Sequence, residues 1–179
     1  MVIRLLGAWL LLAWISACSS LAGGASVDAN ELTELVGTWS GQNQLWVYPG
    51  EPVRESATTA VIRRRASDDA LTIAYDWVEA NETQNGVLTI PLGTSVRART
   101  VEWVDTWHTQ DLPMRFRHDP QHEGLVSVRG SYSAPPGPDW GWRIVLDRES
   151  ADTFRIRMWN VTPEGVEALA VNANLSRVE

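Results

Sequence analysis

The chain has 179 residues, a formal net charge of −7 and one cysteine. Its longest basic run is the three arginines at 63–65, so an acidic chain of this kind is unsuited to nucleic acid and no such partner is expected. A single cysteine excludes a disulfide bond within the chain, so the fold depends on its core. Ten tryptophans, against three tyrosines and two phenylalanines, supply large apolar side chains for that core or for the wall of a ligand cavity.

The first seventeen residues have the pattern of an export signal. Arg4 is followed by an uncharged apolar run from Leu5 to Ala17. That run is shorter than the about 20 residues of a membrane span but matches the apolar part of a signal peptide. It ends in Ile-Ser-Ala-Cys at 15–18, which resembles the bacterial lipobox. The resemblance implies that residues 1–17 are removed and Cys18 is lipidated. The alternative is an ordinary signal peptide with a fortuitous cysteine.

A lipid on Cys18 would attach the protein to a membrane without a spanning segment. In bacterial lipoproteins a residue other than aspartate after the cysteine usually implies transfer to the outer membrane, and Ser19 fits that pattern. Residues 18–27 are small and are predicted to form a flexible tether. We therefore expect an outer-membrane lipoprotein of the bacterial cell envelope that faces the periplasm, with one domain over residues 28–179.

The domain is predicted to be all-β after one short helix. Residues 28–36 place Leu32, Leu35 and Val36 at helical spacing, and Gly37 ends the helix. Beyond it, apolar residues recur at every second position in short stretches. These stretches predict strands at 38–47, 56–65, 70–79, 83–91, 96–107, 113–118, 125–133, 140–148, 153–161 and 166–177. About ten consecutive antiparallel strands close into a barrel or divide into a sandwich.

The alternation also predicts which side chains face the interior. In the third strand the inward residues are Leu71, Ile73, Tyr75 and Trp77. In the last strand they are Leu169, Val171, Ala173 and Leu175. Arg143 is expected on a solvent-facing outer surface, opposite Trp142.

Three short motifs resemble a known family. They are Gly-Thr-Trp-Ser-Gly at 37–41, Glu-Trp-Val-Asp-Thr-Trp at 102–107 and Asn-Leu-Ser-Arg-Val at 174–178. A helix followed by Gly-x-Trp and a meander of strands resembles the calycin superfamily of lipocalins and fatty-acid-binding proteins. The fuller motif is similar to an uncharacterised bacterial family, domain of unknown function 1579, with a lipocalin-like barrel. The resemblance implies an antiparallel up-and-down barrel of about ten strands.

The same resemblance assigns a structural role to the opening motif. In lipocalin-like barrels the first-strand tryptophan covers one end of the barrel and an arginine of the last strand stacks on it. Those positions are Trp39 and Arg177 here. Gly37 and Gly41 are expected to leave room for the helix exit and for bending of the strand. The motif is therefore predicted to close the barrel and not to catalyse a reaction.

The candidate ligand-facing residues lie near the middle of the chain. Trp103, Asp105 and Trp107 are predicted to share one strand face, so that a carboxylate stands between two indoles. Trp77 and Trp142 complete the candidate set. Asp105 is expected either to meet a ligand or, as the simpler interpretation, to pair with Arg97 or Arg99. A third, enzymatic, interpretation would rest on Asp105 and His108, but the same count places His108 on the opposite face, and only a kink at 107–110 would bring the two together. No catalytic residue is therefore predicted.

The remaining histidines suggest no cofactor. His118 and His122 lie in a turn that contains Pro120, where a metal can be imagined but polar loop residues are the simpler interpretation. Haem-binding relatives among ten-stranded barrels use a histidine near the C-terminus, and this chain has none after His122. No metal and no cofactor are therefore expected.

Two functions follow from this reading. The first is a membrane-anchored lipoprotein that binds a small apolar or amphipathic ligand inside its barrel. The second is an envelope interaction or assembly protein whose barrel is filled and whose outer surface binds a partner. A cavity of several hundred Å³ favours the first, and a packed core favours the second. The oligomeric state is not predicted.

Overall fold

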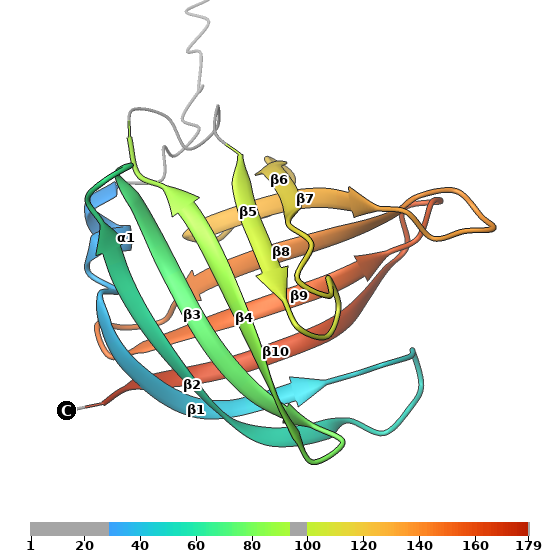
Figure 1. Cartoon of the computed structure of the whole chain (residues 1–179), viewed down its shortest axis with the longest axis horizontal. Helices are drawn as coiled ribbons and strands as arrows, with labels where there is room; N and C mark the ends of the chain where they lie inside the picture. Colours follow the sequence, from blue (N-terminus) through green and yellow to red (C-terminus); the bar gives the residue numbers. More distant parts are fainter. Residues whose placement is uncertain (1–28, 94–99, 179) are drawn as a thin grey trace, which may run out of the picture.

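The computed structural model describes residues 29–93 and 100–178. Its elements, shown in Figure 1, are α1 (Ala29–Thr33), β1 (Gly37–Leu45), β2 (Arg54–Arg65), β3 (Ala70–Glu79), β4 (Glu82–Pro91), β5 (Val101–Asp105), β6 (Met114–His118), β7 (Val126–Tyr132), β8 (Trp140–Arg148), β9 (Thr153–Val161) and β10 (Glu167–Arg177). The predicted short helix and ten strands are therefore confirmed. No helix within the described ranges is long and apolar enough to cross a membrane.

The strands form a closed antiparallel barrel in which each strand pairs with its neighbour in the chain and β10 pairs with β1. Short turns permit this order. Between β3 and β4, Ala80 and Asn81 both have positive φ, at 51° and 65°, as in the tight turns that match the twist of a hairpin. Closure leaves no unpaired sheet edge, which removes the aggregation hazard of an open sheet.

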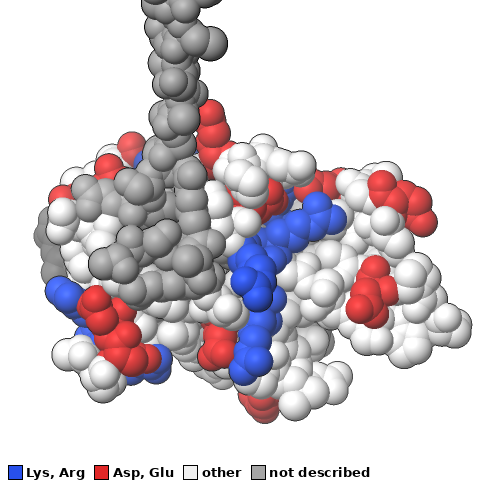
Figure 2. Space-filling view, turned by 90° about the horizontal axis from the view of Figure 1, so that it is seen from above, with Lys and Arg blue, Asp and Glu red and all other residues white. Residues whose placement is uncertain are grey.

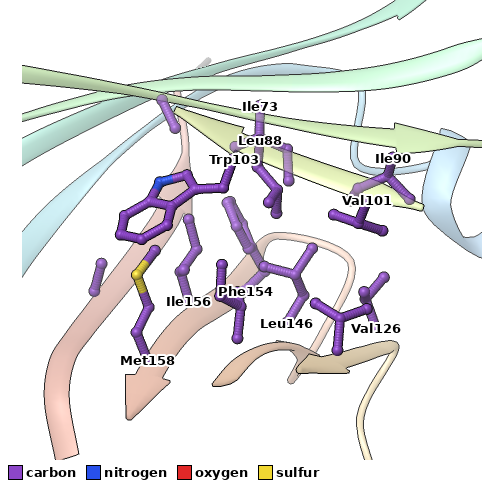
Figure 3. Close-up of a cluster of buried hydrophobic side chains, with 14 of the residues drawn as sticks. Ile73, Leu88, Ile90, Val101, Trp103, Val126, Leu146, Phe154, Ile156 and Met158 are labelled. Carbon is purple, nitrogen blue, oxygen red and sulfur yellow. The ribbon is translucent and has the colours of Figure 1, made fainter. Parts of the chain in front are cut away.

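The core fills the end of the barrel near α1. Ile73, Leu88 and Ile90 come from β3 and β4, and Leu146 and Ile156 from β8 and β9; all are at most 2% exposed. Figure 3 shows this cluster, with Val101 and Val126 at one end and Trp103 and Met158 at the other. The barrel is thus packed at one end, where Trp39 contacts Phe154, and Trp77, Trp103 and Trp142 lie toward the opposite end.

Two details of the alternation were predicted wrongly. A β-bulge between Leu169 and Val171 shifts the register of β10, so Leu169 pairs with Trp159 on the outer side, and Ala170 is buried instead. Arg143 does lie on the outer face, but it is only 2% exposed and does not face solvent.

One strand is shorter than predicted. The predicted strand 96–107 corresponds to β5, which ends at Asp105, and residues 96–99 of the prediction lie outside the described residues. The signal segment 1–17, Cys18 and the tether 18–27 also lie outside them. The chain after Asp105 turns, and this turn shapes the candidate site.

Candidate functional site

The opening motif packs at the closed end of the barrel. Trp39 is fully buried, and its indole N–H donates to the carbonyl of Leu35 at 2.8 Å, just after α1. The Arg177 guanidinium carbon lies 4.2 Å from the centre of the Trp39 ring. Arg177 also donates to the carbonyls of Val36 at 2.9 Å and Glu34 at 2.8 Å. One arginine thus joins the last strand to the helix exit and to the first-strand tryptophan.

Both glycines of the motif occupy positions where a side chain would collide. Gly37 has φ +147°, and a Cβ there would lie 2.6 Å from a terminal nitrogen of Arg177. A Cβ on Gly41 would lie 1.8 Å from the backbone oxygen of Asn174 on β10. Gly37 therefore admits Arg177, and Gly41 allows the two strands of the closing seam to approach each other.

A cavity of about 770 Å³ opens at the other end of the barrel, where β7 and β9 end and β8 and β10 begin. Figure 1 shows these strand ends on its right-hand side. The wall of the cavity is formed by residues of the strands from β5 to β10 and of the loops that follow β1, β5 and β7. Aromatic and apolar side chains predominate in the lining, which includes Trp46, Val47, Trp103, Trp107, Leu112, Met114, Tyr132 and Trp142. A mostly apolar cavity of this size with a few polar groups is typical of small-molecule sites.

Two indoles and an imidazole form the inner wall of the cavity. The rings of Trp103 and Trp142 are stacked, with centroids 5.6 Å apart and planes 10° from parallel. The His108 ring lies 5.3 Å from Trp103 and 5.0 Å from Trp142. The Trp107 ring meets His108 edge to face at 4.4 Å. These contacts present several ring faces and edges, an arrangement that suits a planar or apolar ligand.

Asp105 holds His108 in place. Its side chain is fully buried, and one carboxylate oxygen accepts the Nδ1 of His108 at 2.6 Å. The other oxygen accepts the backbone N–H groups of His108 and Thr109, both at 2.7 Å. The parity argument that separated residues 105 and 108 is therefore wrong, because β5 ends at Asp105 and the following turn brings His108 back onto its carboxylate.

His108 keeps one ring nitrogen for other partners. With Nδ1 bonded to Asp105, Nε2 makes no hydrogen bond to any residue in 29–93 or 100–178, while the ring lines the cavity. The tryptophan donors differ among themselves. Trp103 donates to the Tyr75 hydroxyl at 2.9 Å, whereas the buried N–H of Trp142 has no partner within the described chain. The inner wall thus offers an acceptor or donor at His108, whereas the Trp142 N–H is buried without a partner within the described chain.

A second, very small cavity lies behind this wall. It has about 10 Å³ and is lined by Asn43, Tyr75, Trp77 and the inner side of His108, among others. The rings of Tyr75 and Trp77 stack at 5.6 Å. Burial, with the charge of Asp105 as a smaller cause, raises the pKa of the Tyr75 hydroxyl well above its ordinary value. Tyr75 therefore remains a neutral hydrogen-bonding group.

The predicted ligand-facing residues thus divide into three groups. Trp103, Trp107 and Trp142 line the large cavity. Trp77 lies deeper, at the small one, and Asp105 lies behind His108. The predicted partners of Asp105, Arg97 and Arg99, are outside the described residues.

Sequence reasoning missed several residues of the cavity wall. Tyr132 could have been predicted, because it follows Val126 and Val128 at even spacing on the inward face of its strand. Its hydroxyl donates to Asn160 at 2.7 Å. Trp46 lies beyond the end of β1 and Ala170 at the β10 bulge, so strand parity gave no signal for either. His108 was missed because the turn after Asp105 was not recognised.

The other histidines form a loop cluster. His122 Nδ1 lies 3.1 Å from Asp119, and its Nε2 lies 3.8 Å from Glu167. His118 Nδ1 is buried without a partner within the described chain. Across the described ranges, no three His, Cys, Asp or Glu side chains are grouped so as to hold a metal ion.

A closed ten-stranded antiparallel barrel with a short N-terminal helix over one end and a cavity at the other is a lipocalin-like architecture. The family model for a protein of unknown function, DUF1579, matches residues 28–177, and the chain belongs to that family. No curated protein matches the chain.

Solved structures share the fold at low sequence identity. The chain is similar to an S-type phycobiliprotein lyase, CPES from Guillardia theta, with 13% identity and a TM-score of 0.50, over 87% of this chain and 94% of that one. It is also similar to Rv2717c from M. tuberculosis, with 13% identity and a TM-score of 0.50, over 85% of this chain and 98% of that one. At this identity the likeness shows the fold alone.

Proposed function

We propose that this protein binds a small planar or amphipathic molecule in the cavity at the open end of its barrel. The observation that carries the proposal is the inner wall, where Trp103, Trp142 and His108 present aromatic surface to the cavity. The volume of about 770 Å³ also favours ligand binding over a filled barrel that acts through its surface.

The ligand chemistry follows from the wall. Stacked indoles favour a conjugated or ring-shaped apolar body. A polar group on that body suits the free Nε2 of His108. The fold of the phycobiliprotein lyase is consistent with such a site.

A titration with 1-pyrenebutanol tests the proposal. This neutral probe carries a flat aromatic body of about 20 non-hydrogen atoms with its chain, for which a dissociation constant in the micromolar range is expected at about 0.3 kcal/mol per atom. Binding is followed by energy transfer from the tryptophans to pyrene. If the probe does not bind saturably with one molecule per protein, the proposal is refuted.

Two variants locate the probe. Ala170→Phe places a ring in the cavity that Ala170 lines, and it is expected to weaken binding at least tenfold by occlusion. Trp107→Ala removes one aromatic wall and is expected to weaken binding about fivefold, since an aromatic pair contributes about 0.5–1.5 kcal/mol. Trp159→Phe is the matched control, because Trp159 lies between Arg143 and Arg157 on the outer face. If Ala170→Phe and the control variant bind the probe with equal affinity, the probe binds outside the cavity.

We also propose that the mature protein is held at the outer membrane, on its periplasmic side, by a lipid on Cys18. The support is the apolar run and the Ile-Ser-Ala-Cys motif at 15–18. Mass spectrometry of the full chain expressed in a bacterial host tests this: the expected product starts at Cys18 and carries acyl mass, and Cys18→Ala loses it. An unmodified cysteine in the membrane fraction would contradict the anchor.

A further inference from the structure

Arginines form a row across the outer face of β6, β7 and β8. Arg117 lies directly opposite Arg129, and Arg129 lies directly opposite Arg143. Like charges placed opposite each other on neighbouring strands destabilise a sheet. The whole chain carries a net charge of −7, so this positive row runs against the general composition. Stability of the barrel does not account for it.

The three arginines differ in their partners. Arg143 is buried, pairs with Glu167 and lies 4.2 Å over the Trp159 ring. Arg117 and Arg129 are exposed, and neither makes an ion pair or hydrogen bond with any residue that the structure describes. A Cβ at position 141 would lie 3.3 Å from a terminal nitrogen of Arg129, so the glycine there leaves space for the Arg129 side chain against β8. Two guanidinium groups are thus positioned and unneutralised.

These two arginines line a groove of about 530 Å³. Arg115, Gln121 and Ser131 contribute further donors to its wall. Asp119 is the one carboxylate among its described lining residues, and its oxygens already accept the backbone N–H of Gln121 at 3.1 Å and His122 Nδ1 at 3.1 Å. The groove is therefore rich in donors and poor in free acceptors.

The exposed face of the molecule shows the same feature. Figure 2 shows an unbroken band of arginine side chains across the face seen from above, the side on which Figure 1 places β6 and β7. Acidic side chains lie along the edges of the band and elsewhere on that face. An oxyanion arriving here would meet several donors, and guanidinium groups bind carboxylates and phosphates with paired, charge-assisted hydrogen bonds.

The groove adjoins the ligand cavity. Arg115 and Ser131 line both, at the rim where β6 begins and β7 ends. Arg115 is 74% exposed and donates to Glu102 at 3.1 Å. A molecule with its apolar body among the indoles can therefore extend a short chain over this rim toward Arg117 and Arg129.

We infer that the ligand is an amphipathic anion, with its apolar body in the cavity and its carboxylate or phosphate in the arginine groove. This inference rests on the proposed function, because it names the chemical class of the ligand that the cavity takes. The groove supplies the charge selectivity, and the indoles supply the affinity for the ring system.

A matched pair of probes tests the inference. 1-Pyrenebutanoate and 1-pyrenebutanol share the ring system and the four-carbon chain and differ in the terminal group. The acid is expected to bind roughly tenfold more tightly than the alcohol, because two or three exposed charge pairs each contribute a factor of a few. In the double variant Arg117→Gln/Arg129→Gln, the affinity for the acid is expected to fall to within about twofold of the affinity for the alcohol. The affinity for the alcohol is expected to stay unchanged.

The control variant is Arg63→Gln/Arg64→Gln, which removes the same charge from β2 near the closed end of the barrel, where Ile62 pairs with Gly37. This control variant is expected to change the affinity for the acid and the affinity for the alcohol by no more than about twofold. Inorganic phosphate is expected to weaken binding of the acid, but not of the alcohol, in the unaltered protein.

The outcomes separate the two proposals. If the alcohol binds but the acid binds no more tightly, the arginine groove has no role and the cavity proposal stands. If both double variants weaken the acid equally, the effect is general electrostatic attraction and the groove assignment is wrong. If neither probe binds, the cavity proposal fails and the ligand class falls with it.

Discussion

Arg177→Ala is expected to destabilise the barrel more than a typical surface substitution. The side chain is 29% exposed, but it donates to the carbonyls of Val36 and Glu34 and stacks on Trp39. Two hydrogen bonds contribute about 1 kcal/mol each, and the cation–π contact about 0.5–2 kcal/mol. The ion pair with Asp152 at 3.5 Å adds little, because Asp152 is 76% exposed. The sum is about 3 kcal/mol.

Thermal and urea unfolding, followed by tryptophan fluorescence, measure this loss. For a domain of this size about 3 kcal/mol corresponds to a melting temperature lower by about 6–12 °C. A double-mutant cycle with Trp39→Leu, which removes the ring, isolates the contact between Arg177 and the indole and is expected to give a coupling of about 1 kcal/mol. Arg63→Ala, an exposed position on β2, serves as the control and is expected to change stability by at most about 0.5 kcal/mol. If Arg177→Ala matched that control, the role of Arg177 in closing the barrel would be refuted.

Three further substitutions test other contacts. Gly41→Ala puts a Cβ 1.8 Å from the Asn174 oxygen, so β1 and β10 must separate; a loss of about 3 kcal/mol or more is expected, and an unchanged melting temperature would contradict it. Asp105→Asn weakens the anchoring of His108 and is expected to cost about 1–3 kcal/mol in urea unfolding, whereas full stability would argue against the anchor. The raised pKa of Tyr75 keeps its proton on in the folded state above about pH 10, where unfolded tyrosine ionises. The unfolded state then binds fewer protons, so stability falls with rising pH by about 1.4 kcal/mol per unit. Tyr75→Phe is expected to reduce that slope, and an unchanged slope would mean that Tyr75 ionises within the fold.

Most of the fold could be predicted because its signals are local. Period-two alternation and turn residues depend on short stretches of chain, and they located all ten strands to within a few residues, apart from the undescribed start of the fifth. The bulge at Leu169 and Val171 escaped prediction because parity counting assumes an unbroken register. Whether Arg143 is exposed depends on Glu167 and Trp159, which lie on other strands, so its burial could not be read from the alternation.

The candidate site was predicted less completely than the fold. Trp103 and Trp142 were found because an inward tryptophan on a strand follows from parity alone. His108 was missed because Asp105 ends its strand by accepting the N–H groups of residues 108 and 109, a turn that aspartate side chains favour. The arginine row can be recognised only when the register of β6, β7 and β8 is known, because Arg117, Arg129 and Arg143 lie on three different strands.

The most direct test of the central claim uses the tryptophans as internal probes. Their indole N–H groups give separate signals in a nitrogen–proton correlation NMR spectrum, which is recorded during titration with 1-pyrenebutanol. We predict that the Trp142, Trp103 and Trp107 signals shift, because these rings line the cavity, while Trp39 at the closed end and Trp159 on the outer face stay in place. Shifts centred on Trp159, or none at the cavity tryptophans under saturating probe, would contradict ligand binding in the barrel.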